Sequence, residues 1–384
     1  MKVQLALLCL LLTPVSALGQ VVTLEAIDDS AAEAGQDVGV LRFTRSNSTG
    51  NLTVNVAIEG SSTATINDYS SSDGGTLPVF GTVNFSNGQQ TVDITLTPTL
   101  DNLVEGQEQL DLSLESGSGY TIGSPSSGSI LIADDPPVVT LEAADGDAAG
   151  AGQDPFVFRA SRTGGNINQA LTVNVTIDPG NSADTFNDFS ADDGGTLQVF
   201  ERLAIPGGSA AHEITFTPVL DNRVEAPETF AIALAGGSYL ASGAPNTAGA
   251  VIADDPPIVS ITAATPTAIE GYTPGVLRFE RTGGNPNQIL TVNASFSVAS
   301  SATTGDFSAD DGGTLVVFGT TTIGAGNANR DIVLTAVQDQ LEEGEEELIV
   351  VVDPGGYLVG DPGSATILFL DTPPPLFKDG FEGN

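Results

Sequence analysis

The segment Leu52-Thr53-Val54-Asn55-Val56-Ala57-Ile58 alternates large apolar side chains with small or polar ones. Successive side chains of a β-strand point to opposite faces of a sheet, so this pattern predicts a strand with one buried face. The same alternation recurs at residues 92–96 and 110–114. Turns rich in glycine, serine and asparagine separate these stretches, and patterns with a helical period are absent. The chain is therefore predicted to be all-β.

Around this stretch, the first third of the chain is expected to contain seven short strands. They cover residues 21–26, 38–45, 52–58, 76–84, 92–96, 110–114 and 129–133. Seven strands separated by turns within about 100 residues are expected of an immunoglobulin-like sandwich of antiparallel strands.

The chain contains three copies of this unit. Val-Val-Thr-Leu-Glu-Ala at residues 21–26 recurs at 138–143, and a looser version stands at 258–263. Ile-Ala-Asp-Asp-Pro-Pro closes the first two copies at 132–137 and 252–257, and Phe-Leu-Asp-Thr-Pro-Pro closes the third at 369–374. A paired proline makes a short, extended connector. We therefore expect a rod of three tandem domains, at residues 20–137, 138–257 and 258–374.

Charge and composition limit the partners. Of 384 residues, 49 are acidic and 11 are Lys or Arg, which gives a formal net charge of −38. Nucleic acids and anionic membranes would repel such a chain, so neither is expected as a partner. Hydrophobic residues make up 40% of the chain, which is enough to form a buried core.

The ends of the chain carry two further signals. Residues 1–19 combine Lys2, an apolar run and small residues, which is typical of a secretory signal peptide cleaved after Ala17 or Gly19. Cleavage would remove Cys9, the single cysteine, so stability must come from the core or from bound metal rather than from disulfides. No later segment could span a bilayer, and we expect a secreted or cell-surface protein. Residues 375–384 form a tail, interpreted as either a sorting signal or a disordered remnant.

Acidic residues recur at matched positions in the three copies. The spacing Asp-x3-Glu-x2-Glu follows one predicted strand and leads into the next, which places it in a loop at one end of each sandwich. It comprises Asp101, Glu105 and Glu108; Asp221, Glu225 and Glu228; and Asp339, Glu343 and Glu346. Three other segments add carboxylates that we expect at the same end: Asp134, Asp135, Asp254, Asp255 and Asp371 after the last strand, Asp68, Asp188 and Asp306 before an aromatic residue, and Glu33 and Glu270 before the second strand.

So many carboxylates in one place repel each other unless a hard cation neutralises them. Calcium takes six to eight oxygen ligands in flexible geometry, whereas magnesium demands a strict octahedron. Zinc prefers histidine or cysteine, and His212 is the single histidine. The pattern thus favours Ca²⁺ as the cofactor. The alternative is that these are solvated loop charges of an acidic protein.

Together these motifs resemble the Calx-beta domain, a module of sodium/calcium exchangers and of many secreted or surface proteins. The shared features are Gly-Val-Leu-Arg-Phe-x-Arg at 39–45 and 275–281, Gly-Gly-Thr-Leu at 74–77, 194–197 and 312–315, the acidic loop, the turns ending at Tyr120 and Tyr357, and the closing aspartates. For the first copy the resemblance implies calcium ligands at Glu33, Asp68, Asp101, the carbonyl of Leu103, Glu105, Glu108, Asp134 and Asp135.

The other two copies depart from this ligand set at one position each. Gly150 stands where the first copy has Glu33, and Thr372 stands where it has Asp135. Each of these copies therefore keeps six of the seven carboxylates. Because the number of charged ligands tunes calcium affinity, the first copy is expected to bind calcium most tightly.

Nothing in the sequence indicates catalysis, so the protein is not expected to be an enzyme. Nucleophile elbows, metalloprotease motifs and phosphate-binding loops are missing. Paired carboxylates could hydrolyse glycosides, but the chain has no Trp and only 5 Tyr to stack sugars. The arginine pairs Arg42/Arg45, Arg159/Arg162 and Arg278/Arg281 are expected to form structural salt bridges.

Three functions follow from these observations. The first is a secreted calcium-binding rod with a structural or adhesive role, in which calcium beside the Asp134-Asp135 connector stiffens the junction between domains. The second is a calcium-independent module that binds a surface protein or a glycan. The third is an extracellular calcium sensor in cell communication, which would differ from the first in calcium affinity.

Overall fold

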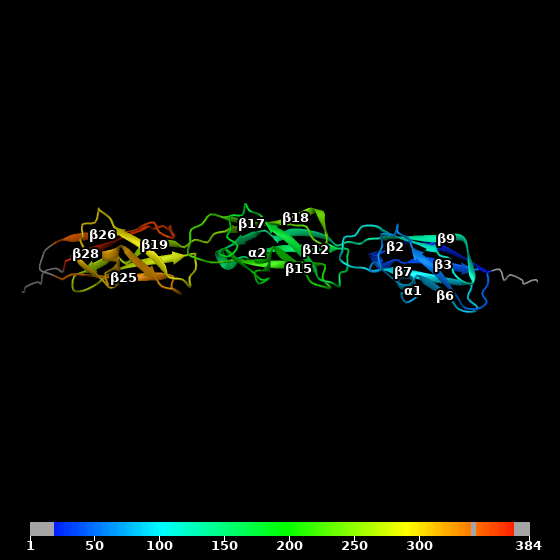
Figure 1. Cartoon of the computed structure of the whole chain (residues 1–384). Coiled ribbons are helices and arrows are strands. Elements are labelled where there is room, and N and C mark those ends of the chain that lie inside the picture. The colour runs from blue at the N-terminus through cyan, green and yellow to red at the C-terminus, as the bar shows by residue number, and fades with distance from the viewer. Residues whose placement is uncertain (1–18, 339–342, 372–384) are drawn as a thin grey trace, which may run out of the picture.

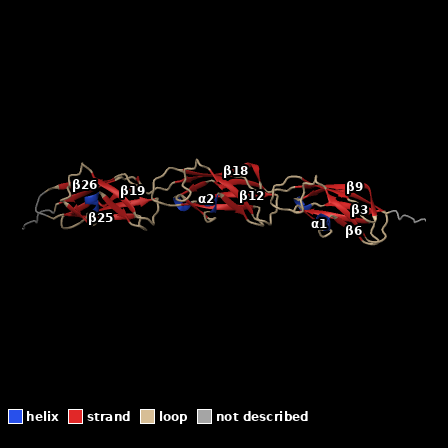
Figure 2. Ribbon diagram, in the orientation of Figure 1, coloured by secondary structure: helices blue, strands red, loops and turns tan. Residues whose placement is uncertain are grey.

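The computed structural model describes residues 19–338 and 343–371. Three β-sandwiches follow one another in a line and form a rod (Figure 1). Strands dominate each sandwich, and the helices are short turns at its surface (Figure 2). Within the described ranges no helix is both long and apolar enough to cross a membrane.

The first domain contains β1 (Gln20–Asp28), β2 (Ser30–Ala32), the 3-10 turn η1 (Ala34–Gln36), β3 (Gly39–Arg45), β4 (Leu52–Ile58), β5 (Tyr69–Ser71), α1 (Thr76–Phe80), β6 (Thr82–Phe85), β7 (Thr91–Pro98), β8 (Glu108–Leu114) and β9 (Tyr120–Ala133). The second contains β10 (Val138–Asp145), β11 (Asp147–Ala149), η2 (Ala151–Gln153), β12 (Phe156–Thr163), β13 (Leu171–Ile177), β14 (Phe189–Ala191), α2 (Thr196–Phe200), β15 (Arg202–Ile205), β16 (Ala211–Pro218), β17 (Glu228–Leu234) and β18 (Leu240–Ala253).

The third domain contains β19 (Ile258–Thr265), β20 (Thr267–Ile269), β21 (Gly275–Thr282), β22 (Leu290–Phe296), β23 (Phe307–Ala309), α3 (Thr314–Phe318), β24 (Thr320–Ile323), β25 (Asn329–Ala336), β26 (Glu345–Val352), β27 (Leu358–Val359) and β28 (Ser364–Leu370). Its two layers are separate sheets, ordered β23-β25-β21-β19-β27 and β20-β28-β26-β22-β24.

In the first two domains the long last strand joins the two layers. The order in the first domain is β5-β7-β3-β1-β9-β8-β4-β6. The first half of β9 pairs with β1 in parallel, and its second half pairs antiparallel with β8 and parallel with β2. The second domain repeats this arrangement.

The immunoglobulin-like sandwich predicted from the sequence is confirmed, with differences in detail. Six of the seven predicted strands of the first copy are present, the strand predicted at 76–84 is present only in its second half, and β2 and β5 are additional short strands. The pairing is not purely antiparallel, because β9 runs parallel to β1 and β2. The last strand begins at Tyr120 rather than Ser129, since its first half belongs to the other layer.

The strand predicted at residues 76–84 was wrong in its first half, which is the one-turn helix α1. The Asp73 carboxylate accepts hydrogen bonds from the N–H groups of Gly75 (3.1 Å) and Leu77 (2.6 Å). Such local side-chain bonds favour a turn over an extended strand. Asp193 and Asp311 make the same bonds before α2 and α3.

The core lies between the two layers of each sandwich. Along β4 the residues Leu52, Val54 and Val56 are buried, as the alternation predicted, whereas Ile58 at the end of the strand is 42% exposed. The second domain has an aromatic centre, in which the Phe156 and Phe216 rings stack with centroids 4.7 Å apart.

The arginine pairs divide into two kinds. The outward member forms a surface ion pair, as in Arg42–Asp93 and Arg278–Asp331, both at 2.7 Å. The inward members Arg45, Arg162 and Arg281 are buried and donate to backbone carbonyls of the adjoining loops. The predicted salt-bridge role is therefore wrong for the inward arginines, because loop carbonyls take the place of carboxylates as acceptors.

A buried tyrosine begins or immediately precedes the last crossing strand of each domain. The Tyr239 hydroxyl accepts a hydrogen bond from the Asn174 N–H (3.1 Å) and donates to the Ala235 carbonyl (2.7 Å). Tyr120 and Tyr357 are bonded in the same way. The hydroxyl therefore connects β13 to the turn before the last strand.

We predict that Tyr239→Phe lowers the unfolding free energy of the second domain by about 1–2 kcal/mol, because a buried N–H and a carbonyl lose their partner. Differential scanning calorimetry would measure the shift. Tyr272→Phe is the matched control, because Tyr272 is 77% exposed and should leave the midpoint unchanged. Equal midpoints for the two variants would contradict the prediction.

Candidate metal centre at the end of each sandwich

Four chain segments meet at one end of the first domain. Because β2 lies parallel to the end of β9, the N–H of Glu33 donates to the Ala133 carbonyl at 3.0 Å. This bond brings Glu33 beside Asp134 and Asp135, which follow β9 directly. Asp68 precedes β5, and the loop from Asp101 to Gln107 leads into β8. The four segments expected to converge do so.

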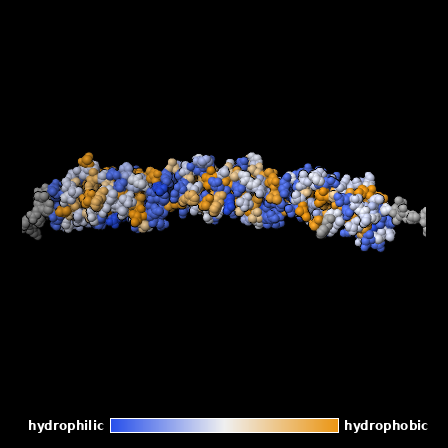
Figure 3. Space-filling view, in the orientation of Figure 1, coloured by the Kyte–Doolittle hydropathy of each residue, from blue (hydrophilic) through white to orange (hydrophobic). Residues whose placement is uncertain are grey.

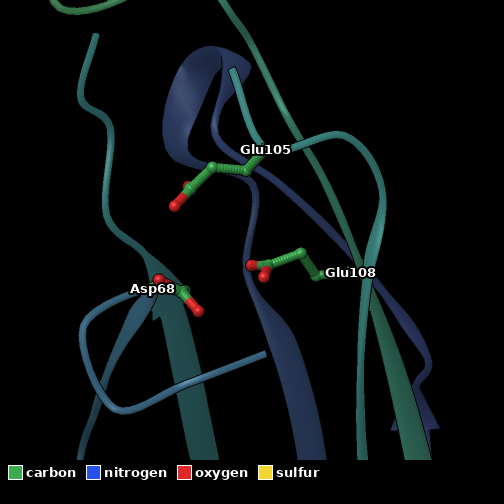
Figure 4. Close-up of side chains that lie close together, drawn as sticks. All are labelled: Asp68, Glu105 and Glu108. Carbon is green, nitrogen blue, oxygen red and sulfur yellow. The ribbon is translucent and has the colours of Figure 1, made fainter. Parts of the chain in front are cut away.

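Three carboxylates form what we call the inner cluster. In the first domain these are Asp68, Glu105 and Glu108, whose carboxylate oxygens lie within 4.8 Å of one another. Their side chains point toward one another (Figure 4), Asp68 from the segment before β5 and the two glutamates from the acidic loop and the first residue of β8. Matching clusters occur in the other domains, formed by Asp188, Glu225 and Glu228 and by Asp306, Glu343 and Glu346.

We call a second group of carboxylates the linker cluster, because two of its members, Asp134 and Asp135, directly precede the Pro136-Pro137 connector. The other two are Glu33 and Asp101, and the charges of Asp101 and Asp134 both act on Glu33. Glu33 is only 3% exposed, and the Asp135 N–H faces its carboxylate at 3.5 Å. In the third domain Glu270, Glu343 and Asp371 form the equivalent group within 4.8 Å, so Glu343 belongs to both clusters.

The closing aspartate holds the acidic loop in place. Asp134 Oδ2 accepts hydrogen bonds from the N–H groups of Glu105 (2.9 Å) and Gly106 (2.7 Å). Asp371 accepts the corresponding pair from Glu343 and Gly344, and Asp254 accepts from Glu225. The other oxygen of Asp134, Oδ1, is buried and receives no hydrogen bond from the described residues. Buried polar atoms are normally paired, so this oxygen is available as a ligand.

The remaining predicted positions can be placed from the same loops. Asp188, Asp221, Glu225, Glu228, Asp254 and Asp255 line one pocket in the second domain, and Glu270, Asp306, Glu343, Glu346 and Asp371 line one in the third. Leu103 lies in the acidic loop, where its N–H donates to Asp101 (2.7 Å), and a ligand role for its carbonyl stays a prediction. Asp339, the predicted signal peptide up to Leu18 and the tail from residue 375 lie outside the described residues.

Comparison with known families decides what these domains are. The Calx-beta domain model matches residues 20–136, 152–256 and 253–373. The chain belongs to the Calx-beta domain family. No curated protein sequence matches it.

Several solved structures are similar to the chain at low identity. CBD12 from CALX1.2 is 13% identical with a TM-score of 0.26, and the match covers 60% of this chain and 99% of the other. Invasin, a bacterial integrin-binding protein, is 13% identical with a TM-score of 0.31, covering 91% and 60%. The adhesin InvE of Yersinia pseudotuberculosis is 13% identical with a TM-score of 0.25, covering 60% and 58%. Membership of the Calx-beta family rests on the family model alone.

The chemistry of these Calx-beta clusters suits a hard divalent cation. The side-chain ligand atoms of the described clusters are all carboxylate oxygens, which suit calcium and magnesium rather than zinc. The ligands also come from separate loops rather than from one rigid element. This arrangement favours calcium, which tolerates irregular coordination better than magnesium does.

Raised pKa values show that the charged form of several cluster carboxylates is unfavourable when no cation is bound. Burial raises the pKa of Glu33 to about 7, and the carboxylates of Asp134 and Asp101 add to the effect. Burial and the neighbouring Asp68 raise the pKa of Glu108 to about 7, and Glu228 has the same value beside Asp188. The pKa values of Glu105, Glu225 and Glu346 are also raised, chiefly by burial.

The second Calx-beta domain neutralises part of its cluster with a residue that sequence reasoning missed. The Arg223 guanidinium lies 3.5 Å from Asp221 and 3.7 Å from Glu225. The first domain has Leu103 at this position and Glu33 where the second has Gly150. Compared with the first domain, the second therefore has one acidic residue fewer and one cationic side chain more at this end. The sequence does show this difference, because Arg223 stands in the acidic loop at the position of Leu103 in the first copy.

We predict that the metal-free protein loses stability as pH rises from about 4.5 to about 7. In that window the folded state binds protons at Glu33, Glu108 and Glu228 that the unfolded state has released, since their folded pKa values exceed the ordinary 4.5. Thermal midpoints measured in chelator across this range would show the fall. Glu108→Gln with Glu228→Gln should flatten it, and a midpoint that rises with pH would contradict the prediction.

Proposed function

We propose that this protein is an exported rod whose Calx-beta domains bind Ca²⁺ at the inner and linker clusters. The observation that carries the proposal is the inner cluster itself, found in all three domains with carboxylate oxygens within 4.8 Å. Three carboxylates at this separation repel one another strongly in the absence of a cation. The buried, unpaired Oδ1 of Asp134 supports a cation at the same end of the first domain.

Each residue would have a defined task in binding. Asp68, Glu105 and Glu108 would hold one ion, and Glu33, Asp101 and Asp134 would supply oxygens to a neighbouring position. The bound cation would remove the repulsion and crosslink the segments before β5 and β8 to the end of β9. Binding would therefore stabilise the folded domain by mass action.

Binding would also stiffen the rod. Asp134 and Asp135 immediately precede Pro136-Pro137, so an ion at the linker cluster would tie the domain to the connector. The second domain repeats this arrangement at Asp254 and Asp255. A stiff, strongly acidic rod outside the cell suits a structural or adhesive role, and secretion follows from the predicted signal peptide.

A second candidate function is binding to a surface protein or glycan without calcium. It is favoured by the apolar side chains on the one-turn helices, where Val199, Phe200, Val317 and Phe318 are all exposed. These residues recur at the same position in successive domains, so a partner would meet them at regular intervals. Scattered apolar side chains are also common on soluble proteins.

We predict that about 1 mM Ca²⁺ raises the thermal midpoint of the chain from Gln20 onward relative to chelator, and that Mg²⁺ at equal ionic strength raises it less. Differential scanning calorimetry should resolve the domains. Glu105→Gln with Glu108→Gln should abolish the calcium shift of the first domain.

The matched control is Glu25→Gln with Glu115→Gln, which removes two exposed carboxylates from the same domain. This control should keep the full calcium shift, because neither residue belongs to a cluster. Superimposable curves in chelator, Ca²⁺ and Mg²⁺ would contradict the calcium proposal and leave the second candidate.

For the second domain, we predict that Arg223→Leu tightens calcium binding about fivefold, since an exposed ion pair is worth about 1 kcal/mol at most. Isothermal titration calorimetry would measure the change. Arg159→Leu, which removes an exposed arginine paired with Glu213 at 3.8 Å, should leave the affinity unchanged. Identical affinities for the two variants would show that Arg223 does not compete with the ion.

A further inference from the structure

In the second and third domains, the loop after the second long strand contacts the acidic end of the preceding domain. In the second domain this loop contains Gly164-Gly165-Asn166, which follows β12. The Asn166 N–H donates to the Asp101 carbonyl (2.8 Å) and to Asn102 Oδ1 (2.8 Å), and its side-chain Nδ2 donates to the Leu100 carbonyl (3.1 Å). The Gly165 N–H donates to the Asp135 carbonyl at 2.8 Å. The two domains thus share four hydrogen bonds here.

The same four bonds recur at the second junction. The Asn285 N–H donates to the Asp221 carbonyl and to Asn222 Oδ1, both at 2.9 Å. Asn285 Nδ2 donates to the Leu220 carbonyl at 2.8 Å, and the Gly284 N–H donates to the Asp255 carbonyl at 2.9 Å. An arrangement reproduced atom by atom in two places is a property of the sequence motif rather than of one contact. Figure 3 shows hydrophilic bands at both junctions.

Glycine is required at both positions of the turn. Gly164 and Gly165 have φ of +71° and +62°, in the left-handed region that side chains disfavour. A Cβ on Gly165 would lie 2.7 Å from Asn102 Oδ1, and one on Gly164 would lie 2.6 Å from the Pro136 carbonyl oxygen. The turn therefore fits closely against the connector and the acidic loop.

The buried arginine shapes this turn from inside its own domain. Arg162 donates to the Ile167 (2.6 Å) and Gln169 (2.8 Å) carbonyls, and Asn166 Oδ1 accepts from the Asn168 N–H (3.1 Å). The Asn166 amide is thus bonded on both sides. A turn that is already ordered before docking loses little conformational entropy when it binds.

We propose that the Gly-Gly-Asn turn is a docking element that recognises the Asp-Asn end of the preceding repeat and fixes the angle between consecutive domains without metal. We call its bonds the junction lock. Its partner is another repeat of this chain that carries Asp-Asn in the acidic loop, as at residues 101–102 and 221–222. The first repeat has Ser46–Asn51 in place of the turn, and the third has Gln340 in place of the asparagine. The lock is therefore directional and operates at the two internal junctions.

The test is small-angle X-ray scattering on the chain from Gln20 onward, in excess chelator. Wild type should scatter as a single extended rod. Asn166→Ala with Asn285→Ala removes the side-chain bond to the preceding domain and the side-chain bond that shapes each turn. The double variant should therefore lose the longest interatomic distances and have a smaller radius of gyration. Asn168→Ala with Asn287→Ala is the matched control, since these asparagines are exposed in the same turns and should leave the curve unchanged.

A second pair of variants tests the other half of the lock. Asn102→Ala with Asn222→Ala removes the acceptor from the preceding domain and should also bend the rod. Circular dichroism with an unchanged thermal midpoint would show that the domains remain folded. Scattering from both lock variants that superimposes on wild type would overturn the proposal. Since every measurement is made without calcium, failure of the lock and failure of calcium binding give separate results.

Discussion

Carboxylates at one end of each sandwich repel one another, and the fold must hold them together against that repulsion. The fold creates this repulsion, because the parallel pairing of β2 with β9 brings Glu33 against Asp134, and the β5 and β8 entrances add Asp68 and Glu105. Asp134 holds the acidic loop through its Oδ2 while Oδ1 stays buried and unpaired. Burial, together with the neighbouring Asp134 and Asp101 carboxylates, raises the pKa of Glu33 to about 7. A divalent cation would neutralise these carboxylates and remove their repulsion.

Three features of the chain offset the repulsion among these carboxylates. Each sandwich has its own apolar core and a buried tyrosine whose hydroxyl holds the turn before the last strand, and these features stabilise the domain that carries the charged end. In the second domain Arg223 supplies a positive charge to Asp221 and Glu225 from within the chain. At the junctions the Gly-Gly-Asn turn binds backbone carbonyls of the acidic loop, which remain available whatever the protonation of the carboxylates. Because Asp101 belongs both to the linker cluster and to the junction lock, an ion in the cluster and docking of the next domain would influence each other reciprocally.

Much of this could be predicted from the sequence. The alternation at Leu52–Ile58 predicted β4 because a strand has a period of two, and the repeated acidic spacing predicted that carboxylates converge at one end. Alternation does not identify a strand's partner, so the parallel pairing of β1 with β9 could not be foreseen. Helix α1 has five residues, too few to show a period, and depends on the Asp73 carboxylate. The roles of Arg223 and Asn166 depend on contacts between loops, which a sequence pattern does not show. The repeated Gly-Gly-Asn at residues 164–166 and 283–285 does indicate a turn shared by two domains.

Whether the carboxylate clusters bind calcium can be measured by isothermal titration calorimetry of Ca²⁺ into the chelator-treated chain from Gln20 onward, at neutral pH. We expect saturable binding of more than one ion per chain. Protons should be released on binding, because Glu33, Glu108 and Glu228 are partly protonated in the metal-free state. Glu105→Gln with Glu108→Gln should reduce the number of ions bound. A titration without saturable heat, together with failure to withdraw calcium from a competing fluorescent chelator, would contradict calcium binding at these clusters.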